Sequence, residues 1–222
     1  IRGYLLYEDC RDKLCDLFTA IGRIDIYCGL AQMFKEREGT DNRWCFAEYV
    51  TDKPTLQVTE MWNPFLSPDV AVANDIMLGG DYKTQHYLIT GPNAAGKSTN
   101  LKAVALTALL AQTCGIVPAQ KCVISPFQIL ETYLNITDDL QQGNSLFKKE
   151  VMRAGELLKR VGNGNTAPAL LVFDEMFNGT TPYEGMSAAY SVAAHLAQRP
   201  NVISVIATHF SYLTSLPKKY DT

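Results

Sequence analysis

The sequence predicts an α/β fold, with a mostly parallel sheet flanked by helices and a helical segment at the N-terminus. Short runs rich in apolar residues predict strands, and these runs lie at residues 87–90, 127–136, 169–173 and 202–207. Helical patterns separate the runs, at residues 97–112, 146–161 and 184–198. Buried strands that alternate with helices are typical of a parallel sheet covered by helices. The 222 residues suffice for one large domain, or for one domain and an appendage.

Near the N-terminus, apolar residues recur at spacings of three and four, which predicts one amphipathic helix over residues 5–38. The apolar stripe comprises Cys10, Leu14, Leu17, Ile21, Ile24, Cys28 and Ala31. The simpler interpretation is a helix packed on the core, and the alternative is a lever that connects this domain to another. A turn follows, so we divide the chain into a helical segment, residues 1–38, and one domain, residues 39–222.

The composition argues against several classes of protein. With 47% hydrophobic and 19% charged residues, the chain can bury a core and is not compositionally disordered. It contains no apolar run of about 18 residues, so we expect no transmembrane helix and no membrane partner. A formal net charge of −3 gives no general attraction to nucleic acid.

The six cysteines are scattered, without a CxxC pair or a histidine at metal-ligand spacing. We interpret most of them as small core residues and expect a reducing compartment, the cytoplasm. The first residues, IRGYLLYEDC, include no initiator methionine and no basic-then-apolar leader. We therefore expect no secretory signal, and we expect the chain to be part of a longer protein.

Residues 91–99 match the pattern GxxxxGK[ST] between a predicted strand and a predicted helix, which is the setting of a phosphate-binding loop. The candidate nucleotide-binding residues are Gly91, Pro92, Asn93, Ala94, Ala95, Gly96, Lys97, Ser98 and Thr99. In such a loop, backbone N–H groups face the phosphate oxygens and the helix N-terminus adds its dipole. We expect Lys97 to reach the terminal phosphates and Ser98 to ligate Mg²⁺.

Two acids follow the predicted strand at 169–173, and they would be costly to bury unless they faced a cation or a polar cleft. We expect Asp174 to belong to the Mg²⁺ shell, as the second acid does in such nucleotide-hydrolysing enzymes. Glu175 is the candidate to orient and deprotonate the attacking water.

His209 follows the predicted strand at 202–207, so it could contact the γ-phosphate or the attacking water. Lys97, Glu175 and His209 are therefore the candidate catalytic residues. His86 and His195 lack such a context, and we expect both at the surface.

The polar segment 138–145, DDLQQGNS, opens the predicted helix at 146–161. A segment of this kind can bind an anion or simply cap the helix, and the residues by themselves favour the cap.

Five segments together resemble, in sequence and in order, the ATPase domain of the MutS family of DNA mismatch repair proteins. They read ITGPNAAGKST, AQTCGIVPAQ, ITDDLQQGNSLFKKE, LLVFDEMFNGTTPYEG and ATHF, within residues 54–217. The resemblance implies a P-loop NTPase of ABC type that hydrolyses ATP with Mg²⁺ at composite sites between two subunits. It implies that Ser145 contacts the partner's γ-phosphate in trans, that residues 178–181 lie across the dimer interface, and that His209 acts as a switch.

The same resemblance implies a partner and a mode of action. The nucleotide state would gate a homodimeric or heterodimeric DNA clamp, and long helices would carry the change to distant domains that grip mismatched or branched DNA. The N-terminal stripe would then belong to such a helix, and the domain by itself would be a weak ATPase.

The chain departs from the family pattern at several positions. Asn178 stands where the family usually has arginine, Leu146 replaces threonine, and Ala95 replaces a glycine of the phosphate loop. Ala71 takes the place of the aromatic residue that stacks on adenine, which leaves Phe65 as a candidate for that role. These differences indicate a divergent member.

Three other functions are compatible with a phosphate loop. An ABC transporter subunit would require an LSGGQ-like helix start, which QQGNSLF matches poorly, and a small-molecule kinase would require an arginine-rich lid. A nucleotide-dependent dimerisation module with little hydrolysis stays open because of Asn178 and Leu146, although Glu175 argues against it.

Overall fold

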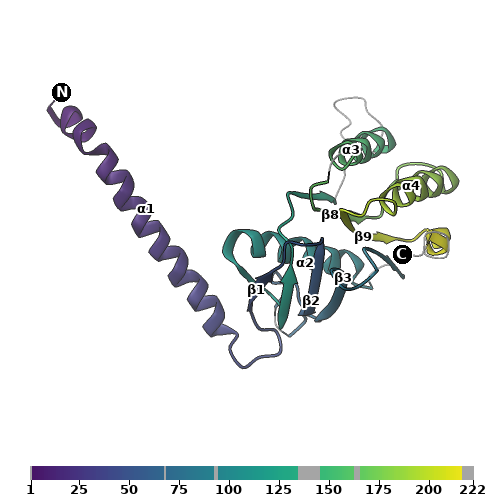
Figure 1. The fold of residues 1–222 in the computed structure, drawn as a ribbon, viewed down its shortest axis with the longest axis horizontal. Coiled ribbons are helices and arrows are strands. Elements are labelled where there is room, and N and C mark those ends of the chain that lie inside the picture. Colours follow the sequence, from purple (N-terminus) through teal and green to yellow (C-terminus); the bar gives the residue numbers. More distant parts are fainter. Residues whose placement is uncertain (1, 68, 93–94, 135–145, 163–165, 217–222) are drawn as a thin grey trace.

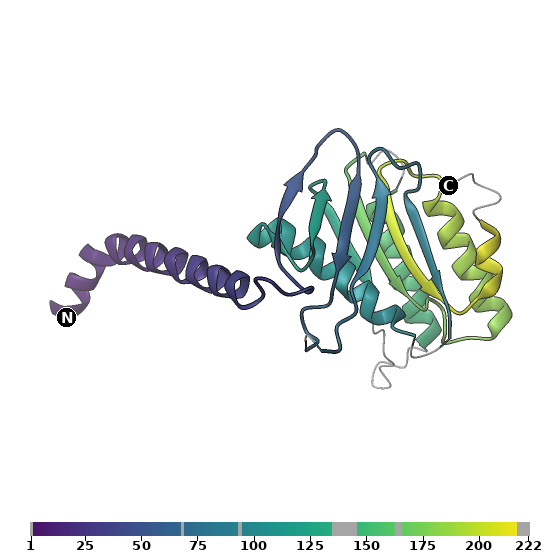
Figure 2. The same ribbon diagram turned by 90° about the horizontal axis from the view of Figure 1, so that it is seen from below.

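Helix α2 lies between two β-sheets, and this layering organises the part of the chain that the structure describes (Figures 1 and 2). The structure is a computed structural model, and it describes residues 2–67, 69–92, 95–134, 146–162 and 166–216. Two helices and a short 3₁₀ helix cover the outer face of one sheet, and the first helix projects away from the body.

Most predicted elements of the second half of the chain are confirmed, with ends that move by a few residues. In order, the elements are α1 (Arg2–Glu36), β1 (Cys45–Tyr49), β2 (Thr55–Met61), β3 (Asn74–Gly79), β4 (His86–Thr90), α2 (Lys97–Cys114), β5 (Ile116–Val117), β6 (Lys121–Ile124), β7 (Ile129–Tyr133), α3 (Leu146–Arg160), β8 (Ala169–Asp174), α4 (Pro182–Leu196), β9 (Val202–Thr208) and the 3₁₀ helix η2 (Ser211–Ser215).

The sheet that positions the site is parallel throughout, with the strand order β4-β9-β8-β7. Its central strands are buried on both faces, because α2 packs on one face while α3, α4 and η2 pack on the other. The register places Thr90 of β4 opposite Thr208 of β9, and Asp174 of β8 opposite Ala207. The carboxyl ends of three strands therefore meet at one edge.

The second sheet corrects the expectation of a mostly parallel sheet. It has the order β3-β2-β6-β1-β5, and of its strand pairs only β1 with β6 is parallel in the described structure. No helix separates β1, β2 and β3, and β2 runs antiparallel to both of its neighbours, β3 and β6. The sequence reading missed these strands because it followed the long apolar runs further along the chain.

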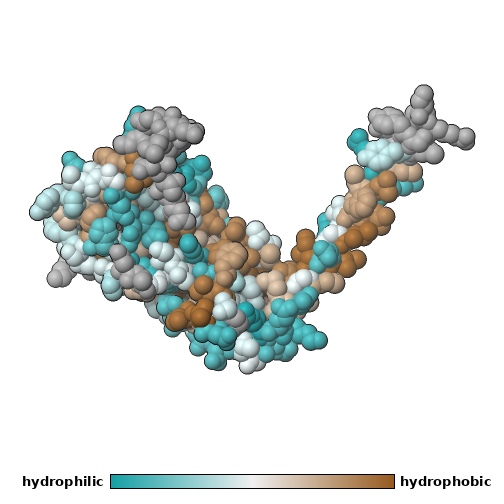
Figure 3. All heavy atoms as spheres, turned by 180° about the vertical axis from the view of Figure 1, so that it is seen from behind, coloured by the Kyte–Doolittle hydropathy of each residue, from teal (hydrophilic) through white to brown (hydrophobic). Residues whose placement is uncertain are grey.

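Helix α1 is long, as predicted, but its apolar stripe is not packed on the core. Leu17 is 53% exposed and Ile24 is 63% exposed, and Figure 3 shows apolar side chains along the projecting helix. Only near its end do residues of α1 join the apolar cluster around Trp44 and Trp62. This exposure corrects the simpler interpretation, a helix packed on the core, and the lever stays a prediction. In the part of the chain that the structure describes, no helix is both long enough and apolar enough to cross a bilayer.

The cysteines and one histidine also differ from expectation. Cys10, Cys15 and Cys28 are exposed on α1, and of the six cysteines only Cys122 is buried, so most are not core residues. His86 is half-buried instead of lying fully exposed at the surface. Its Nδ1 lies 2.9 Å from Oγ of Ser204 on the neighbouring strand β9. Burial lowers the pKa of His86 from 6.5 to about 4.

The buried imidazole predicts a loss of stability in acid. Because the unfolded chain binds the His86 proton more readily between pH 6.5 and about 4, stability is fully present above pH 6.5 and is lost as the pH falls through that window. The shift corresponds to about 3 kcal/mol of unfolding free energy. We expect His86→Gln to remove this part of the pH dependence in urea unfolding measured from pH 7 to pH 4. If the unfolding free energy of His86→Gln fell between pH 7 and pH 4 by as much as that of the parent, the assignment to His86 would be contradicted.

Candidate functional site

Lys97 is the first residue of α2, and its ammonium is buried at the loop that follows β4. The side chain is 7% exposed, and Nζ donates to the carbonyl oxygens of Gly91 and Pro92 at 3.0 Å each. Gly96 caps the helix with a φ of 85°, a left-handed conformation that favours glycine. The loop therefore folds back so that its own carbonyl groups compensate a buried positive charge.

Glu175 meets Lys97 from the neighbouring strand tip. It follows β8, and its Oε1 lies 3.6 Å from Nζ of Lys97. Its backbone N–H donates to the carbonyl of Ala207 at 2.9 Å, which ties the residue to β9. Residues from two distant parts of the sequence, the phosphate loop and the acid pair, are thus brought together as predicted.

Asp174 presents a buried oxygen that has no partner in the described structure. Its Oδ1 is inaccessible to solvent and accepts no hydrogen bond there. A buried acceptor of this kind indicates a site for a donor or a cation. Ser98, the other predicted metal ligand, is exposed in the first turn of α2.

Carboxylate and hydroxyl oxygens such as those of Asp174 and Ser98 are of the ligand type that Mg²⁺ takes in proteins. No group of three or more His, Cys, Asp or Glu side chains able to hold a metal occurs among the residues searched, which are the described ones. Mg²⁺ typically takes one or two protein oxygens, keeps several waters and binds the phosphates of its substrate.

At the tip of β9, Thr208 is buried and His209 is exposed. Thr208 is 2% exposed, and its hydroxyl oxygen accepts a hydrogen bond from the N–H of Phe210 at 3.0 Å. His209 is exposed, with its ring centroid 4.3 Å from that of Phe210. Within the described residues, no hydrogen bond or ion pair joins His209 to Lys97 or Glu175. The imidazole is therefore near the edge where the strands end and open to solvent.

Three predicted site residues, Asn93, Ala94 and Ser145, lie outside the described residues. The rest of the predicted loop frames the approach to Lys97. Ala95 and Gly96 are exposed before α2, and Thr99 offers its carbonyl to the amide of Asn63, at 3.5 Å.

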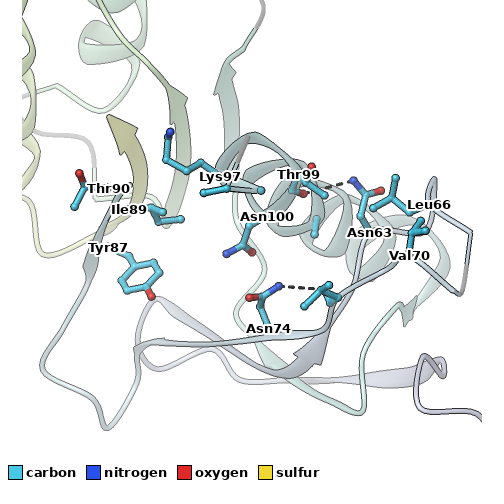
Figure 4. A pocket seen from close by; sticks show the side chains of 14 residues that line it. Asn63, Leu66, Val70, Asn74, Tyr87, Ile89, Thr90, Lys97, Thr99 and Asn100 are labelled. Atoms are coloured by element: carbon cyan, nitrogen blue, oxygen red, sulfur yellow. Dashed lines mark hydrogen bonds between the residues drawn. The ribbon is translucent and has the colours of Figure 1, made fainter. Parts of the chain in front are cut away.

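Beside the loop, a cavity of about 480 Å³ opens between β4, α2 and the segment from residue 63 to residue 74. Its wall is mixed, with aliphatic Leu66, Val70 and Val72, three asparagines and the ring of Tyr87. Figure 4 shows the Tyr87 ring and the amide of Asn100 on the same open space as Lys97. The volume is in the range typical of small-molecule sites.

The aromatic residue that lines the cavity is not the candidate Phe65. Phe65 is 82% exposed and is not among the residues that line the cavity, because the turn at Asn63 directs Leu66 there instead. Tyr87 supplies the aromatic ring. The alternation of β4 could have indicated it, since Tyr87 and Ile89 share the strand face toward α2 while Leu88 packs on the opposite side.

A buried acid on α3 was missed entirely. Glu150 is 3% exposed, and its two oxygens accept the backbone N–H groups of Asn178 and Gly179, each at 3.0 Å. Its position could have indicated it, because Glu150 is the last residue of ITDDLQQGNSLFKKE, one of the five segments that resemble the family.

The fold and this edge define a mixed α/β domain that gathers a lysine and two acids at the ends of parallel strands, beside a cavity. The family model of MutS domain V matches residues 87–222. A curated relative, the DNA mismatch repair protein MutS of Lactobacillus helveticus, is 30% identical over 229 aligned residues that cover 98% of this chain.

The chain therefore belongs to the MutS family of DNA mismatch repair proteins, and the resemblance seen in its motifs is confirmed. The alignment covers 25% of the Lactobacillus helveticus protein, so the chain spans about a quarter of the length of that relative.

Proposed function

We propose that this chain binds ATP with Mg²⁺ and hydrolyses it, and that its nucleotide state gates a dimeric DNA clamp. The observation that carries the proposal is the buried Lys97 ammonium, which lies at the start of a helix and 3.6 Å from the carboxylate of Glu175. An ammonium next to a carboxylate at a loop–helix junction is the arrangement expected for a triphosphate and its attacking water.

In this proposal Lys97 exchanges partners when nucleotide binds. In the structure its Nζ donates to the carbonyl groups of Gly91 and Pro92. The oxygens of the β- and γ-phosphates would take over these hydrogen bonds, and charge-assisted bonds to phosphate are the stronger ones. The ammonium would also neutralise the negative charge that develops on the leaving ADP.

Glu175 acts as the general base. Its carboxylate takes a proton from a water molecule while the water oxygen bonds to the γ-phosphorus. The bond from that phosphorus to the bridging oxygen breaks, and the electron pair leaves with ADP, so the products are ADP and inorganic phosphate. Asp174 and Ser98 would hold a Mg²⁺ ion, which would neutralise negative charge on the phosphates. His209, exposed at the tip of β9, contacts the γ-phosphate in the closed dimer.

The cavity receives the base of the nucleotide. Aliphatic side chains and the Tyr87 ring provide flat apolar contacts, and the asparagine amides provide hydrogen bonds to ring nitrogens. Tyr87 would thus take over the stacking role that an aromatic residue at the position of Ala71 plays elsewhere in the family.

The proposal extends to the whole protein on the basis of the MutS relatives. Two such domains, from identical or different subunits, would enclose two nucleotides, with Ser145 reaching the partner's γ-phosphate. The exposed stripe of α1 supports a lever that transmits this closure toward DNA-binding parts of the protein in the cytoplasm.

One observation favours a second candidate, a dimerisation module that binds ATP with little hydrolysis. The amide of Asn178 donates to Oε2 of Glu175 at 3.3 Å, so Lys97 and Asn178 between them engage both carboxylate oxygens. A base engaged in this way has less freedom to accept a proton from water.

Lys97→Ala is expected to weaken ATP binding by about 100-fold, because two charge-assisted hydrogen bonds to phosphate are lost. Titration of a fluorescent ATP analogue against the full-length protein measures the dissociation constant. Lys102→Ala, an exposed lysine on the same helix, is the matched control and should bind like the parent. Equal affinity in the two variants would remove the basis of the assignment.

Glu175→Gln is expected to bind ATP with near-parental affinity and to lose about 100-fold or more in turnover, because the amide cannot accept the proton. Phosphate release measured under multiple and single turnover separates binding from chemistry. Glu48→Gln, an exposed acid on β1, serves as the control. If the parent and Glu175→Gln hydrolyse ATP equally slowly, the dimerisation module is the better description.

Tyr87→Ala is expected to weaken ATP binding by about tenfold, the value of one aromatic stacking contact. Tyr87→Phe should retain the affinity, because the ring and not the hydroxyl provides the contact. Tyr82→Ala, an exposed tyrosine in the preceding turn, should have no effect. Parental affinity in Tyr87→Ala would place the base elsewhere.

A further inference from the structure

Glu150 stands out because a carboxylate is buried on α3 with backbone donors as partners. At 3% exposure it lies within the layer between α3 and the parallel sheet, and one oxygen each accepts from Asn178 and Gly179. A buried carboxylate is tolerated when hydrogen bonds compensate its charge. Burial, with the nearby Glu150 carboxylate as the second cause, raises the pKa of the Tyr133 hydroxyl.

The loop that Glu150 holds has a strained backbone. Glu175 has a φ of 49° and Phe177 a φ of 62°, left-handed values that side-chain-bearing residues rarely adopt. Such conformations persist when the surrounding structure enforces them. The two hydrogen bonds to Glu150 fall on the residues that come directly after this strained turn.

Close packing adds to the restraint. A Cβ atom on Gly179 would lie 2.8 Å from the backbone nitrogen of Phe147 and 2.8 Å from Cγ of Leu146. The loop is therefore pressed against the first turn of α3, and the absence of a side chain at Gly179 permits this approach.

The restraint reaches the reacting groups through one side chain. Asn178, whose backbone N–H is held by Glu150, donates from its amide to Oε2 of Glu175 at 3.3 Å. The other oxygen of Glu175 faces Lys97. The position of the Glu175 carboxylate thus depends on a chain of contacts that begins on α3.

We propose that Glu150 is a positioning residue, which holds the loop of residues 175–179 so that the Glu175 carboxylate faces the water that attacks the nucleotide. This inference rests on the proposed function. Because Glu150 connects α3 to this loop, a shift of α3 would change the orientation of the Glu175 carboxylate. Helix α3 begins directly after Ser145, the residue proposed to reach the partner's nucleotide. The partner's nucleotide and this chain's hydrolysis would then be coupled through Glu150.

The test compares Glu150→Gln with the control Glu156→Gln, an exposed acid one and a half turns further along α3, in the full-length protein. The glutamine keeps the size but offers one acceptor oxygen in place of two. We expect at least tenfold faster hydrogen exchange at the amides of Asn178 and Gly179, and at least a tenfold fall in kcat. The dissociation constant for ATP should stay within twofold of the parent, and Glu156→Gln should leave all three quantities unchanged.

Gly179→Ala disturbs the same contact from the loop side and should produce the same pattern, even if Glu150→Gln folds poorly. Parental exchange in the loop of both variants would overturn the proposal, and so would a parental kcat in variants whose loop exchanges faster. A parent protein that binds ATP without hydrolysing it would refute the proposed hydrolysis instead. Hydrogen exchange would then still decide whether Glu150 holds the loop.

Discussion

The site is organised around the need of one buried ammonium for oxygen partners. Lys97 enters the interior at the first turn of α2, and a charge in that place is stable only where carbonyl or carboxylate oxygens surround it. Gly91 and Pro92 turn their carbonyl groups inward, and Glu175 approaches from β8. Each of these groups could be replaced by a phosphate oxygen without loss of charge compensation. The same constraint that stabilises the folded chain therefore prepares it for an anionic ligand.

The parallel sheet determines where the two acids lie relative to Lys97. Because β4, β9 and β8 run in the same direction and in register, Thr90, Thr208 and Asp174 end at one edge. Helix α2 packs between this sheet and the mixed sheet, and residues of its first turn line the same cavity as Tyr87. Lys97 thus lines the cavity and also meets Glu175 from the tip of β8.

The loop after β8 is supported from a second direction, by α3. Glu150 accepts its backbone donors and Gly179 lets it approach the helix, so the strained turn at Glu175 has a physical reason to persist. Asn178, which stands where the family usually has arginine, also contacts the site, because its amide donates to the carboxylate of Glu175. A substitution in a family motif is here a new contact within the site.

The sequence by itself determined the local features: the strand–loop–helix around Lys97, the acids after a buried strand, the parallel central strands and the family. These follow from periodicity and from short contiguous motifs, which encode local backbone geometry. Only the tertiary structure decided which distant groups meet. The projection of α1, the burial of Glu150, the presence of Tyr87 rather than Phe65 in the cavity wall and the mixed second sheet depend on contacts between segments far apart in the chain. An amphipathic pattern predicts that one face of a helix is apolar, but it does not predict which other surface packs against that face.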